Sequence, residues 1–244
     1  MRTSKLILGA LLLAGTAMPA FAQDAPTDAP ADAFTISGGA TVVSDYRFRG
    51  FSQTGEEATI QGTFTVSHES GLYVGVWGSG INFNNGTEID VYGGFAKEVA
   101  SGLTADIGAT LYLYPGSTDT TIIEPYFSMT GTVGPATVKG LVAWAPGGQD
   151  SLGDASAVYV AGDVTVGIPE TPLKLKAHLG HAWSDSFLGG YDGNGKVLDY
   201  SIGAEVSWKA LTLGVSYVNT NERNPFKETF GADGAVLFSL GAAF

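Results

Sequence analysis

The chain lacks cysteine and has few basic residues, and each shortage excludes certain classes of protein. None of its 244 residues is Cys, so it has no disulfide framework, no thiolate metal site and no lipid anchor on an N-terminal cysteine. It has 12 Lys and Arg against 24 Asp and Glu, which gives a formal net charge of -12. Such an acidic chain is poorly suited to bind nucleic acid, and we expect no nucleic-acid partner.

Long apolar runs are also missing after the first residues. Arg2 and Lys5 flank the start of an apolar stretch over 6–17, and an A-F-A cleavage site follows at 20–22. This pattern predicts an export signal peptide over 1–22. No later segment approaches the roughly 18 consecutive apolar residues of a membrane-spanning helix. If the mature chain enters a bilayer it must do so as a closed sheet, since only helices and barrels satisfy all backbone polar groups in lipid.

Glycine is abundant, and the chain divides into parts of different character. There are 35 Gly residues, about twice the roughly 7% of average proteins, which suits a β protein with many tight turns. Residues 23–33 are acidic and rich in Pro and Ala, and we interpret them as a flexible periplasmic leader. From 34 to 244 the hydrophobic pattern has a period of two, which indicates a single β domain.

Alternation of apolar and polar residues predicts about twelve antiparallel strands. The segment 34–49 places apolar residues on one face and polar residues on the other, and segments near 103–114 and 198–208 repeat the pattern. The remaining strands are expected near 58–68, 72–82, 88–97, 121–133, 137–145, 156–166, 173–184, 211–219 and 233–244. An even number of long, one-sided strands predicts an all-β, antiparallel transmembrane β-barrel over 34–244.

The connections between these strands also alternate in length. Those at 68–71, at 133–136 and around Lys209 are short, whereas those at 146–155, 185–196 and 220–231 are long. Outer-membrane barrels have short periplasmic turns and long extracellular loops. The sequence therefore predicts periplasmic termini and a location in the outer membrane of a Gram-negative cell.

Aromatic residues on the apolar face gather near the predicted strand ends. Those at the periplasmic end are Phe34, Phe95, Trp208 and Phe244, and those toward the extracellular end are Tyr46, Phe48, Trp144, Trp183, Tyr200 and Tyr217. Two such belts are typical of a barrel in contact with membrane lipid and lipopolysaccharide. A soluble β-sandwich is the competing fold, but it would have to bury about twelve apolar faces in one core.

The last strand ends in an aromatic residue, and three internal motifs resemble a known family. Phe244 shares the apolar face of its strand, which looks like the C-terminal signal by which the barrel-assembly machinery recognises its clients. The motifs SDYRFRGFSQ at 44–53, HESGLYVGVWGS at 68–79 and EIDVYGGF at 88–95 resemble the TorF-type porin family. The resemblance covers about 34–244. It implies an outer-membrane barrel with a transport role and names no solute.

The polar face of the strands supplies the candidate pore lining. These inward residues are Asp45, Arg47, Arg49, Glu88, Asp90, Asp106, Tyr112, Tyr114, Glu124, Tyr126, Lys139, Asp163, Lys174, Lys176, His178, Asp199 and Glu205. Charged side chains there need water or a partner, because an unpaired buried charge is costly. Two interpretations stay open, a narrow wet channel with a transverse field between acidic and basic residues, or a lumen filled by structural ion pairs.

The sequence predicts a passive, narrow and weakly cation-leaning channel for small hydrophilic solutes, without a cofactor. A structural or adhesive barrel with a closed lumen is the alternative. A surface lipid hydrolase would need a nucleophile and a base within reach of each other. His181 followed by Ser184–Ser186 lacks a nucleophile motif, so we expect no enzyme. We also expect no metal site, because the three His residues do not share a strand face.

Overall fold

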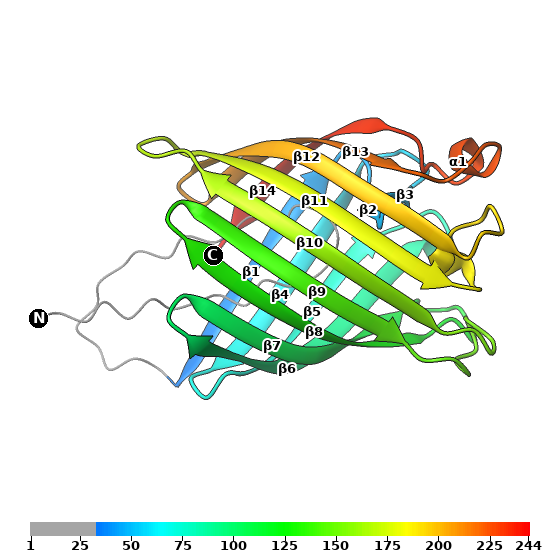
Figure 1. The fold of residues 1–244 in the computed structure, drawn as a ribbon, viewed down its shortest axis with the longest axis horizontal. Helices are drawn as coiled ribbons and strands as arrows, with labels where there is room; N and C mark the ends of the chain where they lie inside the picture. The colour runs from blue at the N-terminus through cyan, green and yellow to red at the C-terminus, as the bar shows by residue number, and fades with distance from the viewer. Residues whose placement is uncertain (1–32) are drawn as a thin grey trace, which may run out of the picture.

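Residues 33–244 form a closed antiparallel barrel of twelve strands in the computed structural model (Figure 1). The barrel strands are β1 (Phe34–Val43), β4 (Thr59–His68), β5 (Leu72–Gly80), β6 (Thr87–Ala100), β7 (Leu103–Leu113), β8 (Ile122–Val133), β9 (Ala136–Ala145), β10 (Ala157–Gly167), β11 (Leu173–Ser184), β12 (Lys196–Trp208), β13 (Leu211–Thr220) and β14 (Ala235–Ala243). The predicted strand number and fold are confirmed. The predicted signal peptide and nearly all of the predicted leader lie outside the described residues.

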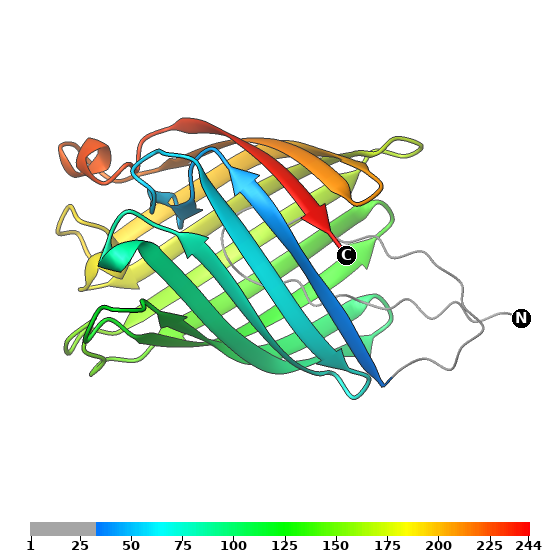
Figure 2. The same ribbon diagram turned by 180° about the vertical axis from the view of Figure 1, so that it is seen from behind.

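Each barrel strand pairs with the next along the chain, and the first strand pairs with the last. The β1–β14 register runs from Gly39 opposite Ala243 to Val43 opposite Ser239. Figure 2 shows this junction, where the blue first strand lies beside the red last strand. Because the sheet closes on itself, no barrel strand has an unpaired edge.

The two faces of the sheet differ in the way that the alternation predicts. In β13, Leu213 and Val215 are exposed on the outside, while Thr212 and Ser216 point inward. The other strands repeat this pattern, so the exterior is an apolar band and the interior is polar. Among the described residues, no helix is long and apolar enough to cross a membrane.

The predicted aromatic belts are largely present. The exposed aromatic side chains near the ends of the strands include Phe34, Phe95, Trp144, Trp183, Tyr200, Trp208, Tyr217 and Phe244. They agree with the predicted positions at both rims. Tyr46 and Phe48 do not belong to the outer belt.

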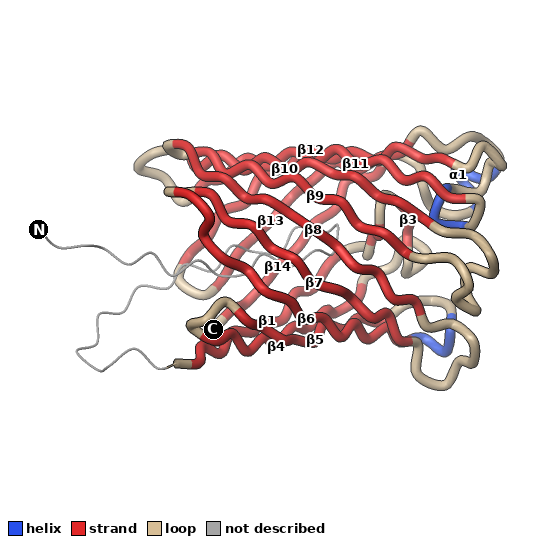
Figure 3. Tube along the Cα trace, turned by 60° about the horizontal axis from the view of Figure 1, so that its bottom comes forward, coloured by secondary structure: helices blue, strands red, loops and turns tan. Residues whose placement is uncertain are grey.

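The connections separate by length between the two ends of the barrel, as predicted. Five short turns lie at the end that carries the C-terminus and the start of β1, and six long connections lie at the other (Figure 3). The long ones contain a 3₁₀ turn η1 (Asn84–Gly86), a second 3₁₀ turn η2 (Phe187–Gly189) and a short helix α1 (Phe226–Thr229). This is the arrangement of outer-membrane barrels with periplasmic termini.

The first strand is shorter than the sequence predicts. β1 ends at Val43 rather than near residue 49, and the chain then turns into the barrel. There it forms a two-stranded hairpin from β2 (Arg47–Phe48) and β3 (Phe51–Ser52), which does not join the barrel sheet. We call residues 46–53 the inner hairpin. The alternation continues through this segment because both kinds of strand have the same period.

The turn of the inner hairpin corrects two further predictions. Arg49 and Gly50 have φ of 48° and 86°, which is the pattern of a tight two-residue turn with both central residues left-handed. This reversal turns Tyr46 and Phe48 inward. Tyr46 is buried, and the Phe48 ring lies edge-on to the inward ring of Tyr112, with centroids 5.9 Å apart. The expectation that both rings face lipid was therefore wrong.

Candidate functional site in the barrel interior

The inner hairpin lies inside the lumen, and the side chain at its tip reaches the far wall of the barrel. A Cβ at Gly50 would lie 2.3 Å from Cγ2 of Thr220 and 3.1 Å from Cβ of Asp199, so the turn contacts the ends of β12 and β13 directly. The guanidinium of Arg49 lies 4.0 Å from the ring centroid of Tyr159 on β10. In the barrel order β13 and β12 lie only two and three strands from β1, whereas β10 lies nearly opposite, so the Arg49 side chain spans the interior.

Arg49 fixes the tip of the inner hairpin to β8. Its Nη2 donates to both carboxylate oxygens of Glu124, at 2.7 and 2.8 Å, and both side chains are buried. The hydroxyl of Tyr112 donates to the same carboxylate at 3.1 Å. Charge-assisted bonds of this kind are strong and directional, so the pair fixes the position of the hairpin as well as its charge.

Arg47 fixes the base of the inner hairpin to the last long connection. It is only 1% exposed, and its Nη1 donates to the carbonyl oxygens of Gly231 and of Asp233, the latter at 3.3 Å. Its guanidinium also pairs with Asp45 and, at 3.3 Å, with Glu56. Asp45 in turn accepts hydrogen bonds from the hydroxyls of Ser52 and Thr54, at 2.6 and 2.9 Å. Asp45 and Arg47 thus hold loops together, although the sequence places them among strand residues.

Glu88 and Asp90 lie on the inward face of β6 and have a different environment. They are 2% and 5% exposed. One oxygen of each, Glu88 Oε2 and Asp90 Oδ1, has no hydrogen-bond partner within residues 33–244. The buried hydroxyl of Tyr46 lies near both, and its pKa is held well above the usual range by burial and by these two negative charges. The pair is a concentration of carboxyl groups in a confined place.

Tyrosines and charged groups fill the middle of the barrel. Tyr73 donates to Asp106 at 2.8 Å and also contacts the hydroxyl of Tyr126. On the opposite wall the imidazole of His178 lies 2.8 Å from Asp163 and 2.9 Å from Asp199. The first group links β5 with β7 and β8, the second links the adjacent strands β10, β11 and β12, and both occupy part of the lumen.

The remaining predicted residues lie on β9, β11 and β12. Lys139 is buried and sits opposite Asp163 in the strand register. Lys176 donates to Glu205 at 2.8 Å, and Lys174 is opposite Glu205 in the register. These side chains lie toward the end with the short turns. The interior thus contains several of the ion pairs that the sequence left as one of two interpretations.

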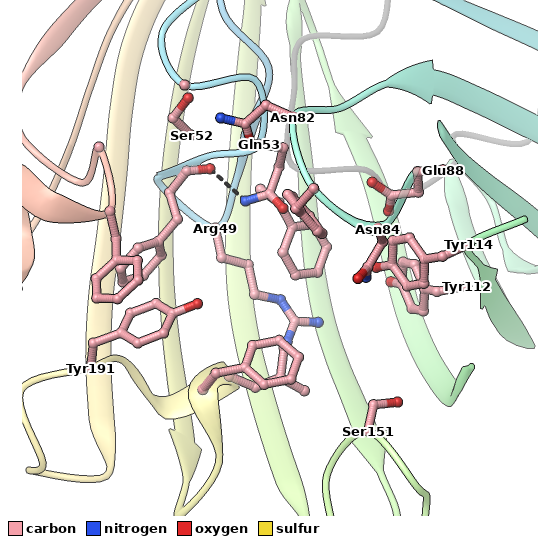
Figure 4. A pocket seen from close by; sticks show the side chains of 18 of the residues that line it. Arg49, Ser52, Gln53, Asn82, Asn84, Glu88, Tyr112, Tyr114, Ser151 and Tyr191 are labelled. Atoms are coloured by element: carbon pink, nitrogen blue, oxygen red, sulfur yellow. Dashed lines mark hydrogen bonds between the residues drawn. The ribbon is translucent and has the colours of Figure 1, made fainter. Parts of the chain in front are cut away.

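A cavity of about 700 Å³ opens above the inner hairpin at the end with the long loops. We call it the vestibule. All six long connections contribute to its lining, together with the inward residues Arg49, Glu88, Tyr112 and Glu124. Figure 4 shows Arg49 in its centre, with Glu88 beside Tyr112 and Tyr114 on one side and Tyr191 on the other. The charged side chains of the lining are Glu56, Glu88, Asp119, Glu124, Glu228 and Arg49.

Several aromatic residues of the vestibule were missed by the sequence analysis. Phe51 lies edge-on to Tyr191 with centroids 5.6 Å apart, and Tyr191 stacks on Phe230 at 3.7 Å. Burial, with the charge of Glu222 nearby, raises the pKa of Tyr191. These residues belong to loops, where no periodicity marks a side chain as inward. The only signal was the turn dipeptide at Arg49 and Gly50, flanked by Phe48 and Phe51.

The residues considered for hydrolysis do not assemble into a catalytic pair. His181 faces outward on β11 and stacks on Trp183, with ring centroids 4.1 Å apart. Ser184 faces inward and bonds to the carbonyl oxygen of Ser156 and to the hydroxyl of Ser186. The two lie on opposite faces of one strand and cannot serve as nucleophile and base. Across residues 33–244, no three His, Asp or Glu side chains are grouped as metal ligands.

Comparison with solved structures identifies the fold. The chain is similar to the NanC porin, with a TM-score of 0.57 and 9% identity over 86% of this chain and 99% of that one. It is also similar to the KdgM porin, with a TM-score of 0.58 and 8% identity over 85% of this chain and 98% of that one. The KdgM porin in complex with disordered oligogalacturonate gives a TM-score of 0.55 at 8% identity, over 86% and 97%.

Sequence comparison identifies the family. None of the curated proteins compared with the chain matches it. A family model described as a bacterial protein of unknown function, Gcw_chp, matches residues 27–244. That match includes every barrel strand, the inner hairpin and all six long loops. The chain is therefore a member of the Gcw_chp family of bacterial proteins.

Proposed function

We propose that this protein is a narrow outer-membrane channel for passive diffusion of small hydrophilic solutes. The observation that carries the proposal is the polar, charged interior of a closed barrel whose exterior is apolar and whose long-loop end opens into the vestibule. Charged side chains inside a barrel need water or partners. A water-filled path past the inner hairpin meets that need and gives hydrophilic solutes a route.

The proposed location follows from features at both ends of the chain. Residues 1–22 have the pattern of an export signal, and Phe244 directly follows β14 as an exposed aromatic residue that the barrel-assembly machinery can recognise. The apolar band between two aromatic belts suits contact with lipid and lipopolysaccharide. The resemblance to TorF-type porins at 44–53, 68–79 and 88–95 supports the same assignment.

The proposed channel is small and favours cations weakly. The inner hairpin and the inward tyrosines restrict it to small solutes, as in other barrels that fill part of their lumen with side chains. Acidic residues exceed basic ones along its wall, and the vestibule carries five carboxylates against one guanidinium. The KdgM porin was solved with oligogalacturonate, an acidic oligosaccharide. The charge of this vestibule disfavours such a solute here.

A closed-lumen barrel with structural or adhesive loops is the second candidate. It is favoured by the ion pairs that hold the inner hairpin, Arg49 with Glu124 and Arg47 with Asp45. If these pairs never open, the lumen is plugged. No reaction is assigned in either case, because the interior offers no nucleophile and base in contact among the residues considered.

Planar-bilayer conductance of the purified full chain tests the proposal. The matched variant replaces 47–52 with two glycines and carries Glu124→Gln and Asp45→Asn, so that neither buried carboxylate loses its cationic partner. Tyr46 O and Gln53 N are hydrogen-bonded at 2.7 Å, so a short link can close the gap. We expect small steps for the wild type and steps severalfold larger for the variant. A variant that conducts beside a silent wild type would favour the closed-lumen barrel, and silence of both folded proteins would exclude a channel.

A further inference from the structure

The two buried carboxylates of β6 are the part of the interior that the ion pairs do not explain. The carboxylates of Glu124, Glu205 and Asp45 each bond to a cationic side chain. Glu88 and Asp90 have no such bond among the described residues, and one oxygen of each lacks any hydrogen-bond partner. Leaving a buried carboxylate unpaired is costly, so a cationic partner from outside the chain would be strongly favoured there.

The surroundings of this pair favour a small cation with carbon substituents. Glu88 lines the vestibule, and Asp90 follows two residues deeper on the same inward face. Asp90 is opposite Tyr112 in the β6–β7 register, and Tyr114 is the next inward residue of that wall. Figure 4 shows Glu88 beside the rings of both tyrosines. Aromatic faces attract ammonium groups and also pack against their alkyl chains.

The other charged groups near Glu88 and Asp90 do not make this part of the vestibule positively charged. Arg49 is the basic side chain of the vestibule lining, and it is neutralised by Glu124 through two hydrogen bonds. Its Nη1 has no partner within residues 33–244, so it can donate to an oxygen of a bound molecule. A bare metal ion is less suitable, because the described part of the chain offers no third His, Asp or Glu side chain grouped with the two carboxylates.

We propose that Glu88 and Asp90 form a binding site at the floor of the vestibule for a small ammonium ion, whose carbon chain lies against Tyr112 and Tyr114. The site identifies the class of solute that the proposed channel would carry. It rests on the proposed function only for the onward passage of the ion into the barrel. Binding itself requires access from the vestibule, which all six long loops line.

Calorimetric titration of the folded full chain in detergent tests the site with three probes of equal length. They are n-butylammonium, 1-butanol and butyrate, which differ in charge and share a four-carbon chain. We expect butylammonium to bind at least about tenfold more tightly than butanol, and butyrate to bind least. Equal binding of the ammonium and the alcohol by the wild type would overturn the site, and this comparison needs no variant.

Variants locate the binding. We expect Glu88→Gln with Asp90→Asn to weaken butylammonium binding about tenfold or more. Asp119→Asn removes one exposed carboxylate from the rim of the same vestibule and serves as the control, with affinity expected within about twofold of the wild type. If the double variant does not assemble, Glu88→Gln alone is compared with the control. Unchanged affinity in the Glu88 variants would overturn the site. Conductance is measured separately, so binding without conductance would contradict the channel and leave the site standing.

Discussion

Arg49 and Glu124 are 75 positions apart in the chain and form a two-pronged ion pair, with Nη2 of the arginine 2.7 and 2.8 Å from the carboxylate oxygens. The pair connects the tip of the inner hairpin to β8, across the lumen from the strand in which the hairpin begins. Part of the lumen is thus occupied by a loop that a few polar contacts hold in place.

Removal of either partner of this pair should destabilise the protein. Both side chains are buried, so Arg49→Met or Glu124→Gln leaves an uncompensated group and should cost about 3–5 kcal/mol. The double variant should lose less than the sum of the two. Urea unfolding followed by tryptophan fluorescence measures the effect. Additive losses in the double-mutant cycle would mean that the two residues do not interact in the folded protein.

Gly50→Ala should displace the tip of the inner hairpin. Its φ is +86°, and an added Cβ would lie 2.3 Å from Cγ2 of Thr220. Backbone strain at a positive φ alone costs more than about 1 kcal/mol. Thr220→Ser removes the methyl group and keeps the hydroxyl that donates to Ala232 O at 2.8 Å, so it should partly rescue the variant. Urea unfolding compares the three proteins. If Thr220→Ser does not restore any stability to Gly50→Ala, the hairpin tip does not contact Thr220.

Ion selectivity should depend on the unpaired carboxylates. In a KCl gradient near 0.1 M, where screening acts beyond about 10 Å, the wild type should show a modest cation preference. Glu88→Gln with Asp90→Asn should reduce it, because both charges face the lumen. Lys174→Gln removes a positive charge instead and should strengthen the cation preference. The reversal potential reports each change. Anion preference of the wild type would place the controlling charge at the basic residues instead.

The orientation can be tested through the absence of cysteine. Asn194→Cys places a thiol in a long connection and Ser70→Cys places one in a short turn, and both positions are exposed. A membrane-impermeant maleimide added to intact cells should label the first and not the second. The reverse result would place the short turns outside the cell.

Loss of Phe244 should impair assembly. Its backbone exchanges hydrogen bonds with Gly38 at 3.0 and 3.1 Å, and its exposed ring lies where the assembly machinery can bind it. Deletion should lower the amount of barrel that migrates differently before and after boiling. Phe244→Tyr keeps an aromatic ring and should assemble normally. Normal assembly of the deletion would show that recognition does not need this residue.

The barrel was predictable because strand period and sidedness are local properties. The alternation alone shows that Leu213 faces outward and Ser216 faces inward, whatever strand lies beside them. The inner hairpin was not predictable in the same way. Its alternation is continuous with β1, although β1 ends at Val43, and only the turn with positive φ at Gly50 marks the segment as a separate hairpin.

The pairing of the interior charges depends on contacts that no local pattern specifies. Arg49 meets Glu124 only because the sheet closes and brings β8 opposite the hairpin. Glu88 and Asp90 were correctly expected to face inward. Their lack of a cationic partner could be seen only once every neighbouring strand was in register, because register determines which side chains stand opposite them.

The junction between β1 and β14 has a consequence for the order of events in biogenesis. It contains five paired residues, from Gly39 to Val43, whereas β1 pairs with β4 over ten. All other barrel strand pairs join successive barrel strands and can form as hairpins, but this one joins residues 196 to 204 positions apart, from Val43 with Ser239 to Gly39 with Ala243. The sheet therefore stays open until β14 pairs with β1. The β1–β14 pairing is therefore both the shortest and the last to form, and we expect the barrel wall to separate there first under lateral tension.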